Sequence, residues 1–175
     1  MLRSIAALVL ASAASHSTET LNSSIPWWER VTVTVTDDGQ TQSCRYESSR
    51  SPNSAKDCAV VDSEAAMAKS VGAKDQYTRI TFERRFNPGV KPEAAALQPG
   101  ETLLSGQVMA MAIDPQGAVK NCKVVATSGS VTPQYGCSEA ATERFDASAG
   151  NARARAEPRE GYLTIVVYGH SEHVV

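Results

Sequence analysis

The sequence predicts an α+β protein built of two small modules, each a strand hairpin followed by a helix and a last strand in an antiparallel sheet. Three observations predict this fold class. Extended apolar runs flank a turn in both halves, each half carries two cysteines at nearly the same spacing, and the tetrapeptide of residues 63–66 (Ser-Glu-Ala-Ala) recurs at residues 138–141. We therefore expect an internal repeat in which a disulfide staples each copy.

The first half opens with valines and threonines that alternate through residues 31–36, which is the two-residue period of a half-buried strand. Residues 37–39 (Asp-Asp-Gly) supply a turn, and residues 41–47 predict the second strand. The alanine-rich residues 63–69 predict a helix. Residues 77–86 predict the last strand of this module.

The second half repeats this order of elements. Residues 107–113 and 118–125 predict two strands joined by residues 114–117 (Asp-Pro-Gln-Gly), where the glycine can adopt the positive φ of a hairpin turn. Residues 137–141 predict a helix, and residues 162–168 predict the final strand.

A pattern of small, apolar and turn residues in this half resembles the carboxy-terminal domain of TonB and its relatives. It consists of Gly106-x-Val108, Ile113-Asp114-x-x-Gly117-x-Val119-x-Asn121-Cys122-x-Val124 and Thr127-Ser128-Gly129. It continues through Cys137, Glu139, Ala140, Ala141, Arg144 and Phe145. Two features depart from the family, since Asp146-Ala147 replaces the usual Pro-Ala step and no Leu-Asp pair precedes the helix. The resemblance implies a sheet that binds an extended peptide by adding it as a further strand.

Four segments divide the chain. Residues 1–17 have the basic start, short apolar run and Ala-Ser-Ala step of a signal peptide, and the apolar run is too short to span a bilayer. Residues 25–86 form the amino-terminal, degenerate TonB-like module, residues 87–102 a linker rich in Pro and Gly, and residues 103–175 the TonB carboxy-terminal-like module. We expect a periplasmic or secreted protein without a membrane span after cleavage, which therefore cannot itself transmit proton-motive force as the full transducers do.

Four cysteines in an exported chain predict disulfides. Three pairings are open, and proximity favours Cys44 with Cys58 and Cys122 with Cys137. Each of these bonds closes a loop for which the chain-entropy model gives about 3 kcal/mol. A zinc site is the competing use, but neither pair has the short ligand spacing of a structural zinc site, so we expect no metal.

The sequence lacks the motifs of common enzymes. It contains no Gly-rich phosphate loop, no Gly-x-Ser-x-Gly elbow and no His-Glu-x-x-His pair. His170, Glu172 and His173 could hold a metal weakly, but we expect a solvated tail. The formal net charge of −2, with both signs interspersed, gives no basic surface for nucleic acid. We therefore expect a non-enzymatic protein without cofactor.

The expected function is to bind an extended peptide or an envelope protein. We expect the final strand to form a sheet edge with unpaired amides, and Tyr162, Thr164, Val166 and Tyr168 to contact the partner. The adjacent rings of Trp27 and Trp28 predict one core tryptophan and one that is partly covered or caps a groove. Two alternatives stay open: a structural envelope protein that keeps the fold without a peptide site, and an enzyme whose site is not recognised.

Overall fold

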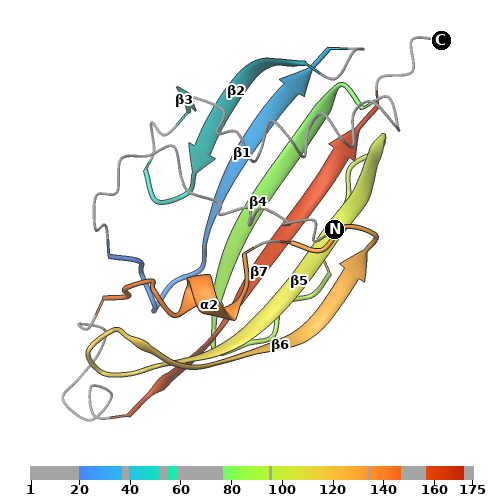
Figure 1. The fold of residues 1–175 in the computed structure, drawn as a ribbon. Helices are drawn as coiled ribbons and strands as arrows, with labels where there is room; N and C mark the ends of the chain where they lie inside the picture. The colour runs from blue at the N-terminus through green and yellow to red at the C-terminus, as the bar shows by residue number, and fades with distance from the viewer. Residues whose placement is uncertain are drawn as a thin grey trace, which may run out of the picture.

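The computed structural model describes residues 20–36, 40–51, 55–58, 77–94, 96–133, 135–146 and 157–171. In this part of the chain seven strands form one sheet in the order β3-β2-β1-β4-β7-β5-β6 (Figure 1). The elements are β1 (Trp27–Val35), β2 (Thr41–Ser48), β3 (Lys56–Asp57), β4 (Arg79–Pro88), β5 (Glu101–Ile113), β6 (Val119–Gly129), α2 (Cys137–Ala140) and β7 (Arg159–His170). Every pair of neighbouring strands is antiparallel.

The predicted α+β class is wrong, because the described chain is almost entirely antiparallel sheet. Of the two expected helices, α2 has only four residues. The chain leaves the helical turn after Ala140 and is held in extended bridges, in which Arg144 pairs with Ala118 and Phe145 with Leu21. The predicted signal peptide of residues 1–17 and the predicted helix of residues 63–69 lie outside the described residues.

The two predicted modules form a single sheet whose halves are related by an approximate two-fold axis. The first half contributes β2, β1 and β4, and the second contributes β6, β5 and β7, with β4 and β7 meeting at the centre. The registers correspond: Val33 opposite Cys44 matches Met111 opposite Cys122. A register shift follows at the equivalent place in each hairpin, before Val35 and before Ile113. These equivalences support the predicted internal repeat.

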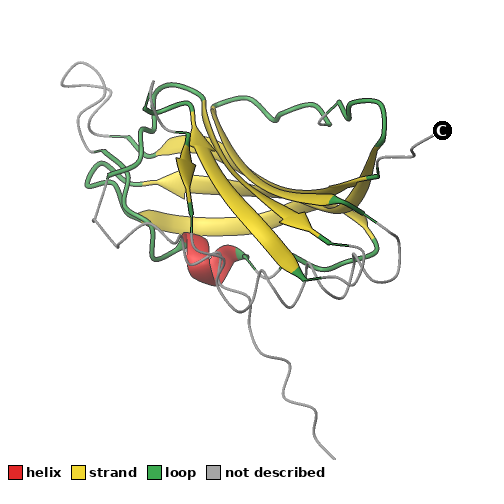
Figure 2. Ribbon diagram, turned by 90° about the horizontal axis from the view of Figure 1, so that it is seen from above, coloured by secondary structure: helices red, strands yellow, loops and turns green. Residues whose placement is uncertain are grey.

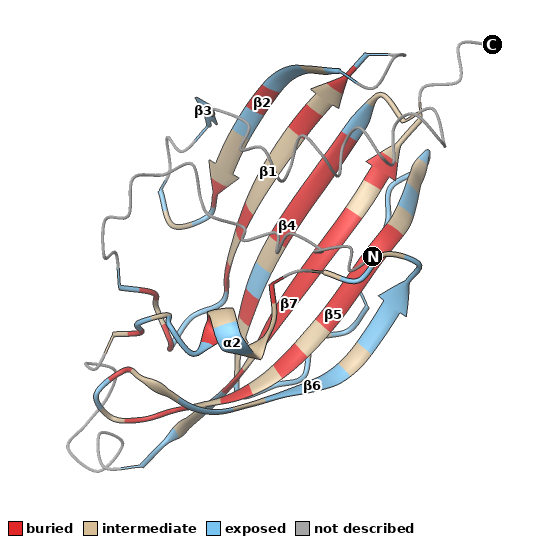
Figure 3. Ribbon diagram, viewed as in Figure 1, coloured by how far each residue is buried: buried red, intermediate tan, exposed pale blue. Residues whose placement is uncertain are grey.

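One face of the sheet carries the apolar core, and we call it the core face. Alternation along the strands directs every second side chain to this face, where two clusters join the halves. The first cluster contains Leu21, Trp27, Phe86, Met109, Met111, Ile113, Tyr135, Ala140, Phe145, Leu163 and Ile165, and the second contains Val33, Val35, Ile80, Phe82, Leu104 and Val167. Figure 3 shows these buried positions running along the central strands.

The opposite face is hollowed by the strong curvature of the sheet, and we call it the concave face. β4 and β5 both run antiparallel to β7, which lies between them, so the chain must cross the sheet to connect them. Residues 89–100 make this crossing. Figure 2 shows α2 on the convex side and this connection spanning the concave side.

The expectation that the final strand is an edge is wrong. β7 lies in the interior of the sheet, paired with β4 on one side and with β5 on the other. Its run from Leu163 to Val167 is buried on both faces, because the strand has a neighbour on each side and the sheet is curved around it. A partner therefore cannot be added to β7.

Candidate binding surface

The four predicted partner-binding residues do come together, but on a face and not at an edge. Tyr162, Thr164, Val166 and Tyr168 alternate along β7 and so share the concave face. Thr164 and Val166 are buried there, whereas the two tyrosines are half-buried. This row divides the concave face between the two halves.

The long open edge of the described sheet is β6. Eight of its eleven residues are exposed, including Val124 at 39 % and Val125 at 38 % (Figure 3). The opposite edge differs, because β3 pairs with β2, with Asp57 opposite Arg45 and Lys56 opposite Tyr46. The two positions that correspond to Arg45 and Tyr46 in the second half are Lys123 and Val124.

The hydrogen bonds of β2 show which amides of β6 point outward. The Cys58 N–H donates to the carbonyl of Cys44 at 3.1 Å, so Cys44 directs its backbone groups away from β1. On the other side of the same strand, the Ser49 N–H donates to the Trp28 carbonyl of β1 at 2.9 Å. In an antiparallel pair these directions alternate from residue to residue. Cys122 and Val124, the equivalents of Cys44 and Tyr46, therefore turn their backbone groups to the outer side of β6.

The beginning of β6 is already occupied. The Phe145 N–H donates to the Gly117 carbonyl at 2.8 Å, and Arg144 pairs with Ala118. In the preceding turn, hydrogen bonds from backbone N–H groups, that of Ala118 foremost, lower the pKa of Asp114. Among the described residues no strand pairs with the outer side of β6 beyond this point.

A groove of about 420 Å³ lies on the concave face directly beside this edge. Its floor is made of small residues, with Ala110 and Ala112 from β5 and Gly161 from β7. Tyr162 and Glu160 bound it on the side of β7, and Asn121 and Lys123 bound it on the side of β6. Met111 and Cys122, whose side chains belong to the core face, complete the lining.

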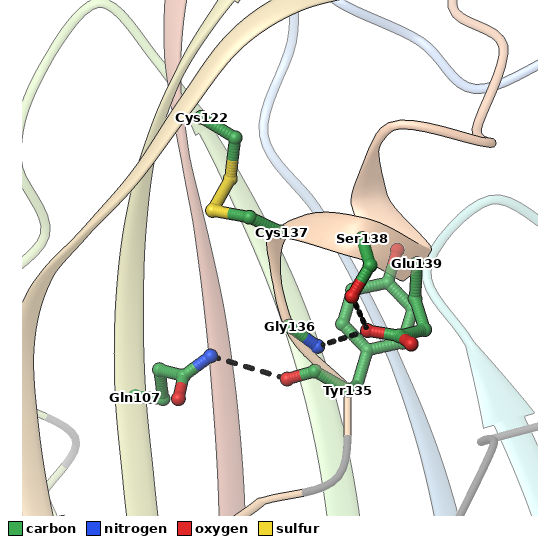
Figure 4. Close-up of a disulfide and its surroundings, with 7 residues drawn as sticks. All are labelled: Gln107, Cys122, Tyr135, Gly136, Cys137, Ser138 and Glu139. Carbon is green, nitrogen blue, oxygen red and sulfur yellow. Dashed lines mark hydrogen bonds between the residues drawn. A yellow bond between two sulfur atoms is a disulfide. The ribbon is translucent and has the colours of Figure 1, made fainter.

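The disulfide between Cys122 and Cys137 fixes α2 over the core face behind this edge (Figure 4). The segment before α2 is tied down as well. Gln107 donates from Nε2 to the Tyr135 carbonyl at 3.1 Å, and the Gly136 N–H donates to Glu139 Oε2 at 2.8 Å. This hydrogen bond to the Gly136 backbone lowers the pKa of Glu139. Cys44 and Cys58 form the corresponding bond in the first half, so both favoured pairings are confirmed.

An ionic network on the core face connects the residues that flank α2 with the first half. Arg84 donates to Glu29 Oε2 from Nε at 3.1 Å and from Nη2 at 2.6 Å, and it also pairs with Glu143. Arg50 pairs with the other oxygen of Glu29, and the Tyr135 hydroxyl donates to Glu143 at 2.8 Å. Burial alone would raise the pKa of Glu29, but the charges of Arg84 and Arg50 outweigh it and hold this pKa below its usual value. The network therefore stabilises the ionised form of Glu29.

The concave face carries charges of its own in the first half. Glu83 is buried there and pairs with Arg85 on the same strand. Arg30 lies 4.3 Å above the Trp28 ring and pairs with Glu47 at 3.2 Å. Trp27 lies in the core, stacked on Phe86 with centroids 5.8 Å apart, so the prediction of one core tryptophan and one partly covered tryptophan is confirmed.

No group of three metal-binding side chains occurs in the described ranges. His170 lies on β7, while Glu172 and His173 lie outside those ranges. None of the helices in the described part is long and apolar enough to cross a membrane. The two disulfides are consistent with an extracellular or periplasmic location.

Comparison with protein-family models, curated proteins and solved structures gives no match to this chain. The resemblance to the TonB carboxy-terminal domain therefore stays a prediction from the sequence motifs. Sequence reasoning missed β6 as the open edge, although a signal was present. Lys120 and Lys123 mark β6 as polar on both sides, and lysine is a typical residue of edge strands.

Proposed function

We propose that this protein is a non-enzymatic binding module of the cell envelope, which takes up an extended segment of a peptide or envelope protein as an additional strand beside β6. Strand addition uses main-chain hydrogen bonds for affinity, so it requires an edge with outward-facing amides. β6 meets this requirement at Cys122 and Val124. The sequence resemblance to the TonB carboxy-terminal domain, whose members bind peptides in this way, supports the same mechanism.

One observation carries the proposal: the equivalent edge of the first half already holds an added strand. β3 pairs antiparallel with β2 at Arg45 and Tyr46, and the Cys58 N–H continues that pairing to Cys44. The equivalent positions of β6 have the same register to the neighbouring strand and a disulfide at the equivalent cysteine. An extended chain can therefore lie along Lys123 and Val124 as β3 lies along β2.

The test removes one outward amide. A phage-displayed library of peptides is selected on the oxidised protein, and the enriched peptides are titrated into the wild type, Val124→Pro and Val124→Ala. Proline is tolerated on an edge strand where its nitrogen faces solvent, so we expect Val124→Pro to fold. We expect it to lose binding by at least about tenfold, since a main-chain bond is lost and the ring crowds the edge. Val124→Ala retains the amide and should bind as the wild type does.

Circular dichroism and the content of free thiols establish that both variants fold with their disulfides. If no peptide is enriched, or if the enriched peptides bind Val124→Pro as tightly as Val124→Ala, strand addition at β6 is refuted. The structural envelope protein then becomes the better interpretation.

A further inference from the structure

We infer that the β6 edge selects an extended segment in which an acidic residue is followed two positions later by an aromatic residue, the aromatic ring filling the groove on the concave face. This inference rests on the proposed strand addition, and it names the class of partner. The observations that carry it are the place of the groove, its small-residue floor, and the opposite charges that lie across from each other in the register of β2 and β3.

The groove is aligned with the outward-facing positions of the edge. Asn121 lies opposite Ala112, and Ala112 lies opposite Glu160, so these three residues form one row across the concave face. Lys123, Ala110 and Tyr162 form the next row. A strand added beside β6 extends both rows by one residue each, and side chains on the concave side of a curved sheet converge. The added side chains therefore point toward the groove.

The row of Ala112 has space for a large side chain. Ala112 contributes only a methyl group, and in this row the β6 residue between the added strand and the floor is Asn121. An aromatic ring opposite Asn121 can extend over the floor toward Tyr162, where two rings gain from packing against each other. An aromatic anchor in a pocket is also the usual source of binding energy at interfaces.

The row of Lys123 favours an acidic residue. β6 contains two lysines and no acidic residue. Lys120 pairs with Asp114 at 3.2 Å. Opposite charges directly across two strands stabilise their pairing. The first half shows this arrangement, because Asp57 lies opposite Arg45, the equivalent of Lys123. If the added strand runs antiparallel to β6, as β3 does to β2, the acidic residue comes first and the aromatic residue follows two positions later.

The experiment titrates defined peptides into the full, oxidised protein and follows fluorescence anisotropy. The probes are KTVDVFVTK, KTVDVAVTK without the aromatic ring, and KTVKVFVTK with the charge reversed. We expect each change in the peptide to weaken binding by about tenfold or more. On the protein, Ala112→Leu should fill the groove and abolish the preference for phenylalanine over alanine. Lys123→Ala should abolish the preference for aspartate over lysine.

Thr34→Leu is the matched control, because Thr34 holds the equivalent position in the first half and should leave all affinities unchanged. Val124→Pro separates the two proposals. If binding is lost in Val124→Pro but the wild type does not discriminate among the three peptides, strand addition stands and the selectivity is refuted. If Ala112→Leu keeps the preference for phenylalanine, the groove is not its site. If none of the peptides binds at all, both the edge and its selectivity are refuted for this class of ligand.

Discussion

The two halves of this sheet use the same hairpin and the same disulfide position, yet they treat their outer edges differently. In the first half, the segment after β2 returns to the edge and forms β3, so that Arg45 and Tyr46 are covered. In the second half, the segment after β6 passes over the core face, where Tyr135 is buried and residues Cys137–Ala140 form α2. No strand of the described ranges covers the edge at Lys123 and Val124.

Under the proposed function, one edge of a repeated fold serves as a binding site because the segment that follows the hairpin takes a different path. Tyr135 covers the core face, and it satisfies Arg84 through its hydroxyl and Gln107 through its carbonyl. Among the described residues, the segment after β6 thus contributes to the core face, whereas β3 covers the edge of the first half.

The two halves differ most clearly in the central row of residues on the core face, and a substitution there should have the largest effect on stability. In the first half Glu29 lies opposite Arg84, and the equivalent pair in the second half is Gln107 opposite Ile165. Arg84→Ile would give the first half the residue of the second. We expect a loss of about 3–5 kcal/mol in the free energy of unfolding, because Glu29, whose side chain is only 10 % exposed, loses its main partner. Urea denaturation monitored by tryptophan fluorescence measures this loss.

Two further variants test the same row. Ile165→Val, at the equivalent position, should cost only about 0.5–1.5 kcal/mol. The double variant Glu29→Gln/Arg84→Ile gives the first half the residue pair of the second. Its loss in the free energy of unfolding should be smaller than the sum of the losses of Glu29→Gln and Arg84→Ile measured separately, because these residues share one network. A loss below about 1 kcal/mol for Arg84→Ile would mean that the network contributes little, against the expectation for a buried pair.

The disulfides provide the second comparison, since their sequence separations of 14 and 15 residues are nearly equal. Cys44→Ala/Cys58→Ala and Cys122→Ala/Cys137→Ala should each lower the free energy of unfolding by about 3 kcal/mol. The consequences for binding should differ. Loss of Cys44–Cys58 frees β3 and opens the β2 edge, so we expect calorimetry to find two sites for a strand-forming peptide in place of one. A stoichiometry that stays at one would show that β3 remains paired without its disulfide.

Local sequence patterns predicted the hairpins and the disulfide pairs, because turn residues and nearby cysteines act within short stretches of chain. The place of β7 depends on a non-local contact, the insertion of the last strand between β4 and β5. The composition of β7 favours this interior position. Its apolar residues lie on both faces, with Leu163, Ile165 and Val167 on one and Val166 on the other, as is typical of interior strands. An edge strand would carry polar residues on its outer side.

The helix of the second half forms at Cys137–Ala140, close to the predicted residues 137–141, but this single turn is too short to make the fold α+β. Ser138, Glu139 and Ala140 have good local helix signals, including the hydrogen bond from the Gly136 N–H to Glu139. Tertiary pairing overrides them, since Leu21 from the distant amino-terminal part bridges Phe145 and accepts the Asp146 N–H at 2.8 Å. The groove could not be predicted either, because its lining comes from three strands whose registers are set by bulges.

Acid should affect the halves through different groups. The folded-state pKa of Glu29 is lowered, so its stabilisation is present above the ordinary value of 4.5 and is lost as the pH falls through the lower folded value. In that range the unfolded chain binds more protons, and the free energy of unfolding therefore decreases with decreasing pH. Urea denaturation at a series of pH values below 4.5 measures the slope. Glu29→Gln should reduce this slope of the free energy of unfolding against pH. The contribution of Asp114 and Glu139 to the slope, which comes from the second half, should persist. An unchanged slope in Glu29→Gln would contradict the assignment.

The smallest expected effect distinguishes a covered edge from an open one in the free protein. Arg45→Glu places a negative charge opposite Asp57 and beside Glu47, which now pairs with Arg45 at 3.6 Å. Like charges across two strands destabilise their pairing, so we expect a loss of up to about 1 kcal/mol and faster hydrogen exchange at Tyr46, which β3 covers. Lys123→Glu, at the equivalent position of β6, has no described strand opposite it and should change the free energy of unfolding by less than about 0.5 kcal/mol. If Lys123→Glu costs as much as Arg45→Glu and the Val124 amide exchanges as slowly as that of Tyr46, the β6 edge is already paired in the free protein. A partner would then have to displace that strand before it could bind.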